Sequence, residues 1–133
     1  MDTNYEGKAA AAIDKFSKGK DFVYIHLEGP DECSHQGDLE GKLTCLSRID
    51  KIVVNNVHKY LEGCGEDYKI LVVPDHRTPV SLRTHSSEPV PFVLYDSRKD
   101  LEVSVEKKYG EKYAEKGSYF GSGVELADYF FAG

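Results

Sequence analysis

The fold is decided by residues 22–35, which have the sequence FVYIHLEGPDECSH. The first six residues form a short, mostly apolar run of strand length, and Gly29 and Pro30 end it. A run without strict alternation predicts a strand covered on both faces, as in a parallel sheet that lies between helices. The polar residues 31–37 that follow are expected to form a loop.

Helical patterns lie on both sides of this stretch. Residues 5–18 contain four consecutive alanines and are expected to form a helix that Gly19 ends. Asp38 is a suitable N-cap for a long helix over residues 39–61, and residues 124–131 predict a short amphipathic helix. The apolar stripe of the long helix, spaced by three and four residues, consists of Leu39, Leu43, Leu46, Ile49, Val53, Val57 and Tyr60.

Two further apolar runs, residues 68–73 and 90–95, predict strands, and the polar residues 97–117 give no clear pattern. The resulting order is helix, strand, helix, strand, strand, helix. Strand–helix–strand units of this kind indicate an α/β fold with a layered, mostly parallel sheet flanked by helices.

Composition bounds the function. The chain has 133 residues, of which 40% are hydrophobic and 30% charged, values typical of one soluble globular domain. A formal net charge of −6 argues against a nucleic-acid partner, and the chain has no apolar run of the ~20 residues that a membrane span needs. Three cysteines without a CxxC pair, and no signal-peptide pattern at the start, favour a cytoplasmic protein.

Candidate metal ligands follow two of the predicted strands. Asp31 and His35 come after the first strand, Asp75 and His76 come after the second, and His85 lies in the same loop. Functional groups of α/β sheets gather at the carboxyl ends of strands, and imidazole with carboxylate is the ligand set of divalent ions such as Zn²⁺ and Mn²⁺. Two such ions about 4 Å apart would suit phosphoryl transfer.

Each residue alone has an ordinary explanation as a turn, cap or solvated side chain, and only their grouping favours a metal site. His26 is interpreted as a core residue or as a residue that supports a ligand, and His58 as a helix-end cation. Cys33 lies between two proposed ligands and could be reactive, but it is interpreted as a small filler, because nothing obvious lowers the pKa of its thiol. Arg77 and Arg83 could hold a phosphate, but an ion pair with a nearby carboxylate is favoured. No motif places a serine as a nucleophile.

Three motifs in the same order resemble the cofactor-independent phosphoglycerate mutases of the archaeal type, within the alkaline phosphatase superfamily. They are DECSH at 31–35, PDHRTP at 74–79, and LRTH at 82–85 followed by PVPF at 89–92. The resemblance runs from about Asp2 to the end of the chain. It implies that residues 1–133 form the C-terminal segment of the metal-binding core domain of an alkaline-phosphatase-like fold.

The resemblance also implies a reaction and a division of ligands. Asp31, His35 and His85 would bind one divalent metal ion, and Asp75 and His76 would form part of a second site. Mn²⁺ is the first choice, with Zn²⁺, Co²⁺ or Mg²⁺ as alternatives. The parent enzyme would interconvert 3-phosphoglycerate and 2-phosphoglycerate through a phosphoenzyme. Its nucleophile is expected in an N-terminal part that this sequence does not match, so we expect no catalytic residue here and an inactive isolated chain.

Two other functions stay open. Some relatives in this group are named homoserine kinases, so a phosphotransferase of the same superfamily is one alternative. A metal-binding or interaction module without turnover is the other. Loss of neighbouring strands would expose a sheet edge, which favours self-association.

Overall fold

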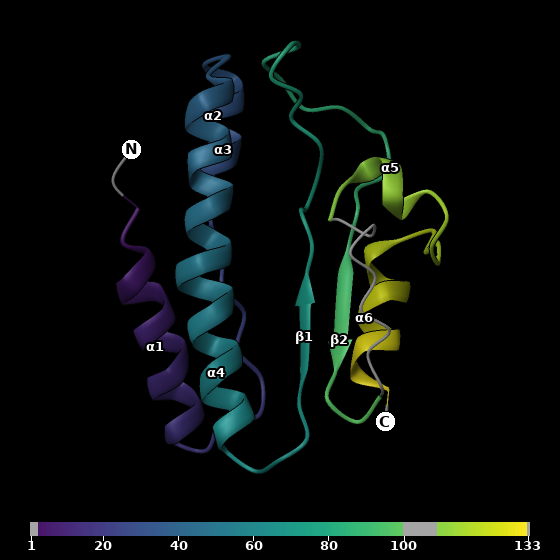
Figure 1. The fold of residues 1–133 in the computed structure, drawn as a ribbon. Coiled ribbons are helices and arrows are strands. Elements are labelled where there is room, and N and C mark those ends of the chain that lie inside the picture. Colours follow the sequence, from purple (N-terminus) through teal and green to yellow (C-terminus); the bar gives the residue numbers. More distant parts are fainter. Residues whose placement is uncertain (1–2, 100–108, 133) are drawn as a thin grey trace. The chain divides into compact units, whose positions relative to one another are not determined.

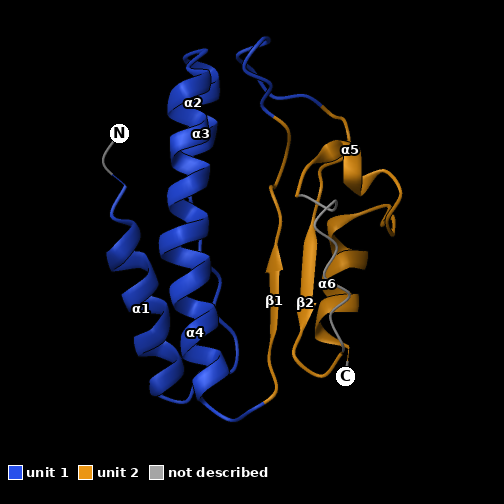
Figure 2. Ribbon diagram, viewed as in Figure 1, with its two compact units in different colours: residues 1–66, 78–86 blue, residues 67–77, 87–133 orange. Residues whose placement is uncertain are grey.

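The computed structural model describes residues 3–99 and 109–132 (Figure 1). It divides into two compact units (Figure 2). Unit 1 consists of residues 1–66 and 78–86, and unit 2 of residues 67–77 and 87–133. Within the described ranges, no helix has both the length and the apolar character needed to cross a membrane.

Unit 1 begins with helix α1, Tyr5–Ser17, as predicted. The Asn4 side chain caps it by accepting a hydrogen bond from the Gly7 N–H at 2.8 Å. Tyr5, Ala9 and Ala12 lie on one face at helical spacing and are buried. The small alanine side chains allow close approach of a neighbouring helix, and α1 packs beside α4 (Figure 1).

The predicted long helix is present and consists of three consecutive segments. They are α3, Leu39–Arg48, the π-helical segment η1, Ile49–Val54, and α4, Asn55–Gly63. Asp38 caps the start by accepting from the Gly41 N–H at 2.9 Å, which confirms the predicted N-cap. The predicted apolar stripe is only partly buried, because Cys45, Val53 and Val57 are buried whereas the side chains of Leu39, Leu43 and Leu46 are exposed.

The prediction for residues 22–37 was wrong in two respects. Residues 22–27 are extended but are in no strand ladder among the described residues, and Phe22 and Tyr24 are 51% and 73% exposed. The next residues form helix α2, Gly29–His35, where a loop was expected. Pro30 lies in the first turn, where its missing N–H costs nothing, and Asp31 and Glu32 favour the helix N-terminus.

Unit 2 contains strands β1, Lys69–Val72, and β2, Val93–Asp96, and helices α5, Glu111–Ala114, and α6, Gly123–Phe131. The predicted strands at 68–73 and 90–95 and the predicted helix at 124–131 are therefore confirmed. Lys69 ties β1 to the C-terminal end of α6, because its Nζ donates to the carbonyl oxygens of Phe130 and Ala132 at 3.0 and 2.8 Å. Part of the polar stretch 97–117 lies outside the described residues.

The layered, mostly parallel sheet is not found in the described residues. The sheet there has two strands, β1 and β2, which pair antiparallel with Lys69 opposite Asp96 and Val72 opposite Val93. The reason is the connection: no helix crosses from the end of β1 to the opposite end of β2, so the chain returns to the same end. The coarser expectation of mixed helices and strands holds.

Candidate metal centre

Helix α2 places Asp31 and His35 on one helical face, because they are separated by four residues. The His35 Nε2 and Asp31 Oδ2 atoms are 3.4 Å apart. The buried Cys33 and Ser34 lie on the side of the helix that packs into unit 1, and the Ser34 hydroxyl donates to the Pro30 carbonyl at 2.9 Å. Asp31 and His35 are thereby presented on the outer side, each about 40% exposed.

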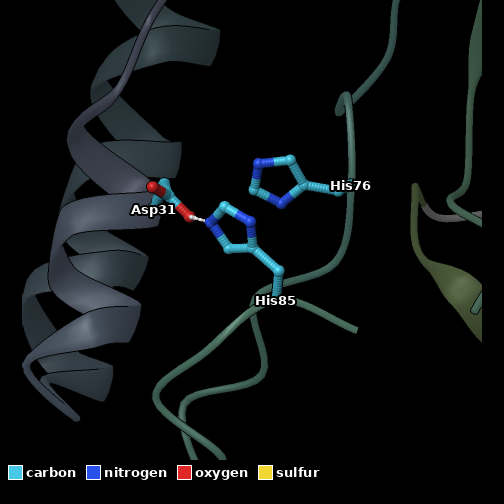
Figure 3. A group of neighbouring side chains, drawn as sticks. All are labelled: Asp31, His76 and His85. Carbon is cyan, nitrogen blue, oxygen red and sulfur yellow. Dashed lines mark ion pairs between the residues drawn. The ribbon is translucent and has the colours of Figure 1, made fainter. Parts of the chain in front are cut away.

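His85 joins this pair from the loop at residues 78–86, which also belongs to unit 1. Figure 3 shows its imidazole directed at the Asp31 carboxylate, where Nε2 lies 3.5 Å from Oδ1. The Nε2 atoms of His35 and His85 are 3.2 Å apart. We call Asp31, His35 and His85 the three-ligand cluster.

The distances within the three-ligand cluster fit a metal ion. Two ligand atoms bound at about 2.0–2.1 Å to a tetrahedral metal lie about 3.4 Å from each other. The two Nε2 atoms are 3.2 Å apart, and they lie 3.4 Å from Asp31 Oδ2 and 3.5 Å from Asp31 Oδ1, respectively, all close to that value. One carboxylate and two imidazoles are ligands that Zn²⁺ and Mn²⁺ accept, and the side chains are open enough for an ion to enter from solvent.

Hydrogen bonds from neighbouring groups fix the orientation of two ligands. The Thr78 hydroxyl donates to Asp31 Oδ1 at 2.5 Å. His35 Nδ1 lies 2.9 Å from the Arg83 carbonyl oxygen, which can only accept. Nδ1 therefore carries the proton of the neutral ring, and Nε2 keeps the lone pair that a metal needs.

Asp75 and His76 belong to unit 2, on the segment that follows β1. Asp75 Oδ1 lies 3.4 Å from His76 Nε2 and accepts from the backbone N–H of the same histidine at 3.0 Å. His76 is also drawn in Figure 3. Beside this pair, Arg77 donates to Glu88 at 3.0 Å, which confirms the predicted ion pair for that arginine.

Cys33 is not set up as a nucleophile. Burial, followed by the hydrogen bond with Cys45 at 3.9 Å, raises the pKa of its thiol. This agrees with its interpretation as a filler. Sequence reasoning missed the roles of Thr78 and the Arg83 carbonyl. Thr78 could have been identified because it lies within the PDHRTP motif. The role of the Arg83 carbonyl could not, because a backbone group has no characteristic sequence pattern.

Comparison with known families gives the class of protein. The family description of the metalloenzyme superfamily matches residues 1–122. The chain therefore belongs to the metalloenzyme superfamily, an assignment in keeping with the three-ligand cluster.

The relatives are more specific, and they confirm the resemblance seen in the motifs. A 2,3-bisphosphoglycerate-independent phosphoglycerate mutase of Methanosarcina barkeri is 43% identical over 118 residues, which cover 89% of this chain and 29% of the relative. The same name belongs to a Sulfurisphaera tokodaii protein, 35% identical over 126 residues, 95% of this chain and 29% of that one. A probable 2,3-bisphosphoglycerate-independent phosphoglycerate mutase of Geobacter sulfurreducens is 47% identical over 95 residues, which cover 71% of this chain and 23% of the relative.

The chain thus spans less than a third of the length of these curated relatives. None of the solved structures compared with it matches.

Proposed function

We propose that the three-ligand cluster is a divalent-metal site of a 2,3-bisphosphoglycerate-independent phosphoglycerate mutase. The observation that carries this proposal is the convergence of two imidazoles on one carboxylate. The Nε2 atoms of His35 and His85 are 3.2 Å apart, and they lie 3.4 Å from Asp31 Oδ2 and 3.5 Å from Asp31 Oδ1, respectively. The names of the relatives support the reaction, and membership of the metalloenzyme superfamily supports the metal. Mn²⁺ is our first choice among the ions that accept this ligand set.

Asp75 and His76 are proposed to contribute to a second metal site, with further ligands from outside this sequence. A carboxylate and an imidazole on adjacent residues supply two donor atoms, fewer than a divalent ion requires. Bound metal ions supply charge neutralisation for a transferring phosphoryl group and a lowered pKa for a coordinated hydroxyl. The residues of this chain hold the ions in place and leave the nucleophile to another segment.

The substrate in this proposal is a small phosphorylated acid, 3-phosphoglycerate or 2-phosphoglycerate. Because no serine or threonine in the chain is marked as a nucleophile by a motif, the 133 residues alone are expected to show no mutase turnover. If the purified chain shows mutase turnover and His85→Ala abolishes it, the expected inactivity of the chain is contradicted. Such a result would support a complete active site within these residues.

Metal binding is the direct test of the site. Calorimetric titration of the metal-free chain with Mn²⁺, and separately with Zn²⁺, is expected to give about one tight equivalent. His85→Ala should remove that equivalent, whereas His58→Ala, on α4, is the matched control and should retain it. Wild-type chain that binds neither ion at micromolar concentration would contradict a metal site formed by this cluster.

The competing reaction is phosphorylation of homoserine. An enzyme that contains this sequence together with the segments its longer relatives possess should be assayed with 3-phosphoglycerate, and with homoserine plus ATP. The proposal expects turnover of phosphoglycerate only. Turnover of homoserine alone would replace the mutase assignment and leave the metal site intact.

Residues 22–27 support a proposal of self-association in a cytoplasmic protein. This extended segment has no strand partner among the described residues, and its aromatic side chains at positions 22 and 24 are exposed. A segment that lies in no strand ladder can add a strand from another chain. Sedimentation velocity should show mass increasing with concentration, and Tyr24→Pro should suppress it; a monomer at all concentrations would contradict this.

A further inference from the structure

The loop at residues 78–86 contacts α2 and α3 through groups that are not metal ligands. Thr78 is 6% exposed, and its hydroxyl donates to Asp31 Oδ1 at 2.5 Å. The carbonyl oxygen of the same residue accepts from Lys42 Nζ at 3.1 Å. The start of the loop is therefore tied to α3, and the bond from Thr78 fixes one oxygen of the Asp31 carboxylate.

The second point of contact is Arg83, whose backbone has an uncommon conformation. Its φ is +54°, the one positive value among the described residues other than glycine. Residues with a Cβ adopt this region reluctantly, so the surrounding structure must hold Arg83 there. In this conformation the Arg83 carbonyl accepts the hydrogen bond from His35 Nδ1 at 2.9 Å.

Gly37 makes room for the Arg83 side chain. This glycine follows α2 and has a φ of +71°. A Cβ on it would lie 2.5 Å from Arg83 Nε and 2.8 Å from the guanidinium carbon. The guanidinium therefore rests directly against the Gly37 backbone, in space that any other residue would fill.

We propose that Arg83 and Thr78 are positioning residues for the metal site. Arg83 acts through its backbone carbonyl, which holds His35 as the tautomer with its proton on Nδ1 and its lone pair on Nε2. Thr78 acts through its hydroxyl, which holds the Asp31 carboxylate. The proposal rests on the proposed metal site but concerns how the ligands are oriented before any ion binds.

Two substitutions at position 83 separate a backbone role from a side-chain role. Arg83→Gly keeps the carbonyl and tolerates a positive φ, whereas Arg83→Val keeps a side chain but disfavours that φ. Arg83→Gly should bind Mn²⁺ or Zn²⁺ within a few-fold of wild type. Arg83→Val should bind about 10–100-fold more weakly, the usual loss when an outer partner of a ligand is removed.

Two substitutions at position 78 test the role of the hydroxyl in the same way. Thr78→Ser retains a hydroxyl and should preserve affinity, whereas Thr78→Val has nearly the same shape without a donor and should lose about 10–100-fold. Thermal unfolding of each metal-free variant reports the fold separately. Equal loss of affinity in Arg83→Gly and Arg83→Val would overturn the backbone role, and full affinity in Thr78→Val would overturn the hydroxyl role.

A measurement without metal makes the inference independent of the proposed function. Nitrogen-15 NMR of the metal-free chain at pH 8 distinguishes a protonated Nδ1 from a protonated Nε2. We expect His35 to be protonated on Nδ1 in wild type and Arg83→Gly, and to become a mixture in Arg83→Val. An Nε2-protonated His35 in wild type would overturn the inference, even if the chain binds metal. The expected tautomer in a chain that binds no ion would contradict the metal site alone.

Discussion

The three-ligand cluster of unit 1 and the Asp75–His76 pair of unit 2 use the same residue types but are held differently. In unit 1, Asp31 is oriented by Thr78 and His35 by the Arg83 carbonyl, residues about fifty positions away in sequence. In unit 2, Asp75 is 68% exposed and accepts from the backbone of its own neighbour. The same residue types are therefore more preorganised in the cluster than in the pair. Preorganised ligands bind a metal ion more tightly, because the side chains lose less conformational freedom on binding.

The largest effect is expected from removing the shared carboxylate of the cluster. Asp31→Ala should weaken Mn²⁺ or Zn²⁺ binding by more than about 100-fold, beyond the usual loss of an outer partner, because it deletes a ligand itself. Asp75→Ala, the matched change in the exposed pair, should leave the tight equivalent of the isolated chain unchanged. Calorimetric titration measures both. Equal losses in the two variants would remove the distinction drawn between the cluster and the pair.

An intermediate effect, on the free energy of unfolding, is expected from a substitution at Gly29, where α2 contacts the rest of unit 1. A Cβ on Gly29 would lie 2.9 Å from the buried Tyr5 hydroxyl and 3.1 Å from Cys45 Sγ. Overpacking of this kind costs about 1–3 kcal/mol, so Gly29→Ala should lower the free energy of unfolding by that amount.

Gly63→Ala is the matched control for that substitution. Gly63 ends α4, and a Cβ there meets no atom within 4 Å. The change should be neutral or stabilise by up to about 1 kcal/mol. Urea denaturation compares the two variants; a Gly29→Ala chain as stable as Gly63→Ala would mean that α2 is not anchored by this contact.

The smallest effect concerns the acid stability of unit 2. Hydrogen bonds from Arg98 hold the pKa of Asp96 well below its ordinary value of 3.8, and two of them measure 3.0 and 2.8 Å. Because the pKa is lower in the folded state, this stabilisation is present above pH 3.8 and is lost as the pH falls toward the folded-state pKa. Arg98→Gln should raise the pKa of Asp96 and shift acid unfolding to higher pH.

Lys99→Gln is the control for the acid series, because the backbone N–H of residue 99 donates to the Asp96 carbonyl oxygen and is kept in this variant. Carboxyl carbon-13 NMR follows Asp96 directly, and circular dichroism follows unfolding. An unchanged titration of Asp96 in Arg98→Gln would show that the ion pair does not set this pKa. The three-ligand cluster in unit 1 should be unaffected by either substitution.

Sequence periodicity predicted the helices well and the sheet poorly. The helices α1 and α6 and the Asp38 cap follow from local patterns, which need only residues a few positions apart. A strand needs a partner, and residues 22–27 have the composition of a strand but no ladder in the described residues. Their neighbours 31–35 were expected to be a loop because of their polarity, whereas a proline in the first turn and two acidic residues suit a helix start.

The sequence selected residues that lie together in the structure, but it did not identify the groups that orient them. Asp31, His35 and His85 were selected by residue type and by motifs, and the structure brings these three together. The reasoning from strand ends was wrong for Asp31 and His35, because a helix carries them. Arg83 could be identified as a nearby cation, but its contribution through a backbone carbonyl depends on a positive φ that no side-chain pattern encodes.

The π-helical segment η1 affects how the long helix formed by α3, η1 and α4 tolerates a change of length. Adding one residue to a regular α-helix turns everything beyond it by about 100°, which would turn Val57 out of its buried position. A wider turn takes up one additional residue locally and lets both flanking segments keep their buried faces. Residues 49–54 are therefore where the chain can shorten by one exposed residue, such as Lys51, and become a regular helix without losing the alignment of Cys45 and Val57. Length variation among homologous sequences is expected to concentrate there.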